Sequence, residues 1–167
     1  MVHAATEQKR RPKPVARSPR DFDYSLDYKK IDLRESPEIY RVGKGEQGVL
    51  LVEPYKSEIL PHWKFKTPGE AKKSALAIMR LFRGYKKEKD FVGMDMSRKF
   101  LQMGYTRARR YANHRSGRKY DRDGKILARE VDEVKARSAA IFYDHWRRVE
   151  ADPTYAKLKK QWKRDYG

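Results

Sequence analysis

The sequence contains no cysteine, which excludes disulfide bridges and thiolate metal ligands. It has no apolar run close to the ~20 residues that a membrane-spanning helix needs, and its first residues lack the apolar core of a secretory signal. Hydrophobic residues make up only 38% of its 167 residues. We therefore expect no membrane partner and a location in the cytoplasm, inside a virion or, in a eukaryotic host, in the nucleus.

Positive charge is what the sequence has in excess. Lys and Arg number 41 against 23 Asp and Glu, a formal net charge of +18. Such a chain repels itself when compact unless a polyanion neutralises it, and nucleic acid is the first candidate partner. The excess is concentrated, because residues 67–120 alone contain 15 basic and 4 acidic residues.

The composition divides the chain into two regions, 1–20 and 21–167. Residues 1–20 include "KRRPKPVARSPR" and almost nothing apolar, so burial cannot offset the entropy of ordering them. We predict a disordered basic tail over 1–20, either an arm that follows nucleic acid or a solvated leader. Residues 21–167 carry the aromatic and aliphatic residues of a single domain.

The predicted fold class is α+β. "IYRV", a glycine loop and the β-branched run "VLLVEPY" predict a β-hairpin, and "ILPHWKF" a further short edge strand, because Pro61 breaks the pattern. Together they predict a small antiparallel sheet over about 40–66.

Three or four helices are predicted over about 67–166. Thr67-Pro68-Gly69-Glu70 has the cap, proline and acid of a helix start. Apolar residues at helical spacing then predict helices to about 87, from about 94 to 114 and from about 126 to 150. Asp152-Pro153 ends the third and caps a final short helix.

The stretch "FLQMGYTRARRYANHRSGRKY" is Arg-rich and amphipathic. At about 100° per residue its apolar residues share one arc and its basic and amide residues the other. Asp95 is the only acid between residues 91 and 120, whereas solvated helix faces usually mix both signs. We predict phosphate and base contacts from Arg98, Lys99, Gln102, Thr106, Arg107, Arg109, Arg110, Asn113, His114, Arg115, Arg118 and Lys119. The alternative is pairing of this face with Glu130, Asp132 and Glu133.

Residues 43–48, "GKGEQG", match G-x-G-x-x-G. The motif is followed by a predicted strand and not by a helix, so it does not fit a dinucleotide-binding turn. We interpret it as a hairpin loop with positive-φ glycines. A phosphate-binding nest formed by Gly43, Lys44, Gly45 and Gly48 is the alternative.

An enzyme acting on nucleic acid or a phosphorylated small molecule is the alternative to a binding protein. Glu53, Glu58 and His62 are its weak candidates, because a carboxylate beside a histidine can transfer protons. The four histidines have no metal-binding spacing, so we predict no metal and no cofactor. A structural component of a ribonucleoprotein or virion is a third class that fits the composition.

Two stretches resemble a known family: "RVGKGEQGVLLVEPYKSEILPHWKFKTP" (41–68) and "FVGMDMSRKFLQMGYTRARRYANH" (91–114). They are similar to a family of small uncharacterised proteins of bacterial, fungal and tailed-phage genomes, over roughly residues 22–150. The resemblance implies a complete small protein of phage or bacterial origin and no activity or site residue. The residues themselves favour nucleic-acid binding, with DNA preferred over RNA.

Overall fold

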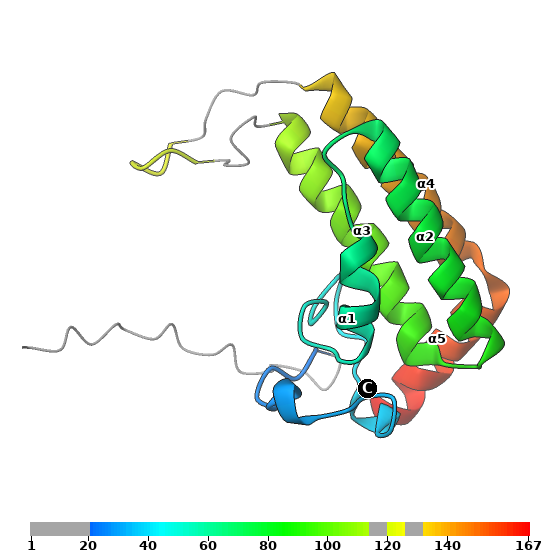
Figure 1. Cartoon of the computed structure of the whole chain (residues 1–167). Coiled ribbons are helices and arrows are strands. Elements are labelled where there is room, and N and C mark those ends of the chain that lie inside the picture. The colour runs from blue at the N-terminus through cyan, green and yellow to red at the C-terminus, as the bar shows by residue number, and fades with distance from the viewer. Residues whose placement is uncertain (1–20, 114–119, 126–131) are drawn as a thin grey trace, which may run out of the picture.

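The computed structural model describes residues 21–113, 120–125 and 132–167, and within these ranges the protein is all-helical (Figure 1). The predicted tail, 1–20, lies outside the described residues. Five α-helices and three short 3-10 turns follow in chain order: η1 (Tyr28–Lys30), η2 (Pro37–Ile39), α1 (Tyr55–Ile59), η3 (Leu60–His62), α2 (Pro68–Lys87), α3 (Phe91–Asn113), α4 (Glu133–Ala151) and α5 (Pro153–Tyr166).

The predicted α+β class is wrong, because no β-strand occurs in the described residues. Residues 43–51 form successive turns closed by short-range hydrogen bonds, such as Val49 N to Glu46 O at 3.2 Å and Leu51 N to Gly48 O at 3.0 Å. Gly43, Gly45 and Gly48 all have positive φ, which keeps the chain turning where a strand would extend. The predicted third strand is the end of α1 and η3.

The predicted helix starts and stops are mostly confirmed. Thr67 Oγ1 accepts a hydrogen bond from Glu70 N at 3.1 Å, so α2 begins as its capping residues predict. Asp152 separates α4 from α5 and caps α5 by accepting from Tyr155 N at 3.0 Å. Helix α3 begins at Phe91, three residues before its predicted start, and α4 begins at Glu133, seven residues after its predicted start near 126, because Asp132 caps it.

The core lies among α2, α3 and α4, each of which packs against the other two. Helix α5 crosses one end of this bundle, and the segment from Phe22 to Leu60 covers the first half of α3 (Figure 1). Helices α3 and α4 approach closely at Gly104, where an added Cβ would lie 2.5 Å from Phe142 Cδ1. In the described ranges, no helix has the length and apolar character needed to cross a membrane.

Candidate nucleic-acid interface

Arg98 and Lys99, both predicted to contact nucleic acid, are buried instead. Their exposed fractions are 2% and 0%. The first half of α3 is covered on all sides, because residues 22–60 fold over the face that the other helices leave open. Helical periodicity correctly separated these two residues from the apolar arc, but their burial removes both from the interface.

The two cations belong to a buried ionic cluster on α3. Arg98 Nη2 and Asp95 Oδ1 are 2.8 Å apart, with 3% and 0% of the side chains exposed. Tyr155 donates its hydroxyl to Asp95 at 2.6 Å, and Tyr40 donates to the second carboxylate oxygen. Lys99 Nζ donates to the carbonyl of Gln47 at 2.5 Å. The cluster thus joins α3 to α5 and to the N-terminal segment.

Burial and neighbouring charges shift the pKa values of Asp95 and Lys99 in opposite directions. Burial alone would raise the pKa of Asp95, but the charges of Arg98 and Lys99 and the hydroxyls of Tyr155 and Tyr40 lower it below its usual value. Burial lowers the pKa of Lys99 to about 7, against the opposing attraction of Asp95. We interpret the cluster as a structural anchor, because its charged side chains are out of contact with solvent.

The second half of α3 keeps its basic residues on the surface. Arg107, Arg109 and Arg110 are exposed, as is Thr106. None of the three arginines forms an ion pair with an acidic residue in the described parts of the chain. The alternative pairing with the start of α4 is not seen for Asp132 or Glu133, and Asp132 instead caps α4 through Val134 N and Lys135 N. Glu130 lies outside the described residues.

The amide side chains predicted at this face are half-buried. Gln102 Oε1 accepts from Arg98 Nη1 at 2.8 Å, so a buried cation fixes Gln102 at the edge of the exposed face. Asn113, the last residue of α3, is also half-buried. The remaining predicted contacts fall outside the described residues: His114, Arg115, Arg118 and Lys119.

One acidic side chain reaches this face from the glycine loop. Glu46 accepts from Thr106 Oγ1 at 3.2 and 3.1 Å through its two carboxylate oxygens. Burial raises the pKa of Glu46, and the Thr106 hydroxyl and the charges of Arg107, Arg98 and Arg110 act in the opposite direction. Glu46 was not among the residues predicted from the sequence, although an acid inside the glycine loop, two residues after Lys44, was the available signal.

The glycine loop lies against α3 and uses its polar groups internally. Lys44 N donates to Gln47 Oε1 at 2.8 Å, and Gly48 N donates to Tyr24 Oη at 3.1 Å. The carbonyl of Gly45 accepts from Arg98. The positive-φ glycines are thus confirmed, while the hairpin is wrong. A phosphate nest at Gly43, Lys44, Gly45 and Gly48 stays a prediction, and two of its amides already have protein acceptors.

The enzyme candidates lie close in sequence but not around one cavity. Glu58 accepts from Arg34 Nη2 at 2.5 Å and from Tyr85 Oη at 2.9 Å. The hydrogen bond from Arg34 is the main cause of the lowered pKa of Glu58, with burial opposing it. Glu53 accepts from Ser57 N of α1 at 3.2 Å and lies 3.6 Å from Lys56 Nζ. His62 is exposed on η3.

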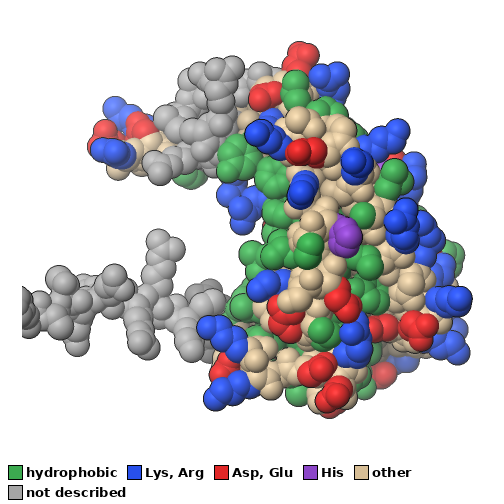
Figure 2. Space-filling model, in the orientation of Figure 1, with side chains coloured by type: hydrophobic (Ala, Val, Ile, Leu, Met, Phe, Trp, Pro, Cys, Tyr) green, Lys and Arg blue, Asp and Glu red, His purple; other side chains and the backbone are tan. Residues whose placement is uncertain are grey.

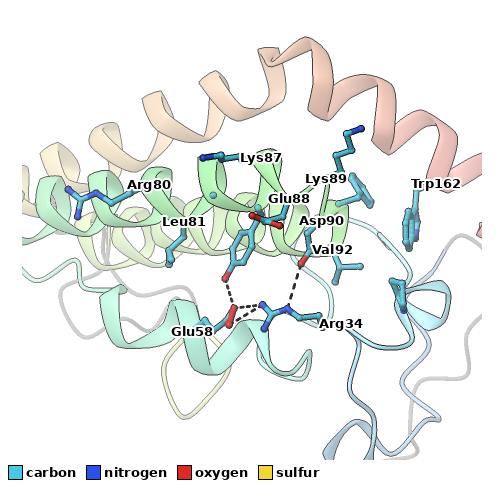
Figure 3. A pocket seen from close by; sticks show the side chains of 14 residues that line it. Arg34, Glu58, Arg80, Leu81, Lys87, Glu88, Lys89, Asp90, Val92 and Trp162 are labelled. Carbon is cyan, nitrogen blue, oxygen red and sulfur yellow. Dashed lines mark hydrogen bonds and ion pairs between the residues drawn. The ribbon is translucent and has the colours of Figure 1, made fainter.

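A cavity of about 760 Å³ lies between α1, α2, the start of α3 and α5. Figure 3 shows the Arg34 guanidinium between Glu58 and Asp90, with Trp162 across the opening. Glu58 is the one enzyme candidate among the lining residues; Glu53 and His62 do not line it. Arg34 is paired with Glu58 and Asp90, and three further cations, Arg80, Lys87 and Lys89, also line the cavity. In the described ranges, no three His, Asp or Glu side chains gather as a metal site requires.

Fold and surface together define a small, strongly basic, all-helical protein with an arginine-bearing helix face. The chain belongs to the family described as Domain of unknown function (DUF4385), which matches residues 23–165. No curated protein and no solved structure matches the chain.

Proposed function

We propose that this protein binds nucleic acid, DNA in preference to RNA, through the exposed half of α3. The observation that carries the proposal is the set of three arginines, Arg107, Arg109 and Arg110, which are exposed together and form no ion pair among the described residues, although the Glu46 carboxylate lies at the edge of their face. Three unpaired guanidinium groups on one helix suit phosphate oxygens, which they can bind in a bidentate manner.

The order of side chains around α3 supports DNA. At about 100° per residue, Arg109 and Arg107 lie on the two flanks of an arc of roughly 160°, with Thr106 and Arg110 between them. The major groove of B-DNA admits an α-helix, whereas the deep, narrow groove of A-form RNA does not. Flanking arginines would contact phosphates, and the central side chains would face base edges. The basic residues of 1–20 and 114–119 are expected to add affinity.

The test is duplex binding across a salt series by Arg107→Gln/Arg110→Gln. Each neutralised phosphate contributes a log–log slope of about −0.9, so loss of two contacts should reduce the slope by about 2. Lys29→Gln/Lys30→Gln is the matched control, because both lysines are exposed on η1, outside the arc of Arg107, Arg109 and Arg110, and the net charge falls equally. Equal effects of both double variants would mean that net charge alone, and not this face, governs binding.

The enzyme alternative is not favoured, because of Glu53, Glu58 and His62 only Glu58 lines the 760 Å³ cavity. We propose that the protein is located in the cytoplasm, inside a virion or, in a eukaryotic host, in the nucleus. We also propose that the family is distributed over bacterial, fungal and tailed-phage genomes. Both remain predictions from the sequence.

A further inference from the structure

Helix α2 carries a second basic face, which the sequence analysis did not single out. Lys72, Lys73, Arg80, Arg83 and Lys87 are all exposed. At about 100° per residue they fall, with Leu76 and Gly84, within one arc of about 120°. Glu70 is the one acid of α2, and it lies outside this arc. An unmixed basic arc of this kind is unusual on a helix that is merely solvated.

The cations of this face have no acidic partners in the described parts of the chain. Lys86, on the same helix but outside the arc, differs from these cations because it forms an ion pair with Asp152 at 2.8 Å. The protein thus neutralises a lysine of α2 that borders α4 and α5, and leaves the five outward ones available to an external anion.

The dimensions of the face suit a nucleic-acid backbone. From Lys72 to Lys87 the helix rises about 22 Å, which corresponds to roughly six phosphates of one strand. The face offers Lys and Arg and no amide or hydroxyl group. Its contacts would therefore be with phosphates and independent of base sequence.

This face and the α3 face point in different directions. Because α2, α3 and α4 each pack against the other two, the outward side of each helix faces away from its neighbours. Figure 1 shows α2 on the right-hand side in front of α4, and Figure 2 shows Lys and Arg side chains spread over this side of the molecule. The exposed half of α3 lies on the opposite side of the bundle in Figure 1. We therefore expect a straight duplex seated along α3 to leave the cations of α2 uncontacted.

We propose that the α2 face holds the phosphate backbone of a second duplex while the α3 face holds the first, so that one molecule bridges two nucleic-acid segments. The inference rests on the proposed function, because the first duplex is held by Arg107, Arg109 and Arg110. The chemistry is the same at both faces, but the α2 contacts are to phosphates alone.

The experiment measures bridging directly. One short duplex is fixed to beads, and recovery of a second, fluorescent duplex is followed as protein is added. Wild-type protein should recover the fluorescent duplex. Lys72→Gln/Arg80→Gln/Arg83→Gln should lower this recovery about tenfold while binding to a single duplex weakens about threefold or less, because the α3 face is intact. Glutamine has a helix propensity close to that of Lys and Arg, so α2 should still form.

The matched control is Lys29→Gln/Lys30→Gln/Lys157→Gln, which removes three exposed lysines outside both faces. It should bridge as wild type does. Bridging that survives in the α2 triple variant would overturn the inference and would assign bridging to self-association or to other basic segments. A wild-type protein that binds one duplex without bridging would overturn it too and leave the proposed function standing. Absence of any duplex binding would instead overturn the proposed function.

A lipid surface is the competing polyanion for the α2 face. Vesicles containing phosphatidylserine provide the probe. If wild-type protein binds them, the α2 triple variant does not, and neither protein bridges duplexes, the face is a membrane contact and the inference is wrong.

Discussion

Asp95 and Arg98 lie one turn apart on α3 and form a 2.8 Å ion pair that is almost completely buried. The pair is held from two other parts of the chain, since Tyr155 of α5 and Tyr40 of the N-terminal segment both donate to Asp95. Half of an apparently basic helix is thereby committed to holding the fold together. The other half carries the exposed arginines of the proposed interface.

Asp95→Asn should be strongly destabilising. It leaves the buried charges of Arg98 and Lys99 without their carboxylate, and removal of one partner of a buried pair costs about 3–5 kcal/mol. Urea unfolding measures the loss. Asp144→Asn is the control, because Asp144 and Arg148 also lie 2.8 Å apart on one helix but with 57% and 63% of the side chains exposed. That change should cost less than about 1 kcal/mol, and similar losses in both variants would contradict the role given to burial.

The free energy of unfolding should rise with pH above neutrality because of Lys99. Its pKa is about 7 in the folded protein and about 10.4 in an unfolded chain. Between these values the unfolded state binds a proton that the folded state lacks, which favours folding as pH increases, by at most about 1.4 kcal/mol per pH unit. Urea midpoints at several pH values in this window test the effect. Lys99→Met should abolish the rise, and an unchanged pH dependence in that variant would assign it to other groups.

Glu46→Gln should tighten duplex binding by about threefold to tenfold, because it removes the negative charge beside Arg107 and Arg110. Titration of a labelled duplex at fixed salt measures the change. Glu35→Gln removes an exposed acid outside the α3 face and should have a smaller effect. Equal gains from both substitutions would mean that only net charge matters.

Gly104→Ala should destabilise the protein by about 1–3 kcal/mol, since the new Cβ would lie 2.5 Å from the ring of Phe142. Gly84→Ala offers the comparison, because no atom lies within 4 Å of the position of its Cβ. That change should be neutral or stabilise α2 by up to about 1 kcal/mol. Thermal unfolding of the two variants tests this. An effect of helix propensity alone would change the stability of both variants in the same direction, whereas a packing effect destabilises only Gly104→Ala.

The sequence was sufficient where structure depends on neighbouring residues. Thr67 and Asp152 begin helices as predicted, because capping involves residues three positions apart. It was insufficient where distant segments meet. Arg98 and Lys99 have the helical phase of surface residues. They are buried because residues 40–48 fold over α3 and because Tyr155 of α5 contacts Arg98. Asp95, three residues before Arg98 in a helix without other acids, was the local hint of a buried pair.

The apolar run "VLLVEPY" led to the wrong prediction of a β-strand for a related reason. Val49 and Val52 are buried as strand residues would be, whereas Leu50 and Leu51 are exposed. Short apolar runs do not distinguish a strand from turns that bury every third residue. The positive φ angles of Gly43, Gly45 and Gly48, which precede or begin this run, favour turns over a strand.

The backbone amide of Asp132 donates to the carbonyl of Ala112 at 2.7 Å. This hydrogen bond joins the end of α3 directly to the start of α4. Closure of the bundle is fixed by this junction, so the length of the intervening stretch, residues 113–131, is a variable independent of the helical packing. Loop closure costs grow only slowly with length. Insertions at 121–124, which keep the basic residues of 114–119, should leave the three-helix bundle and the exposed arginines of α3 intact, so this stretch is suited to carrying a tag, a fluorophore or a foreign peptide.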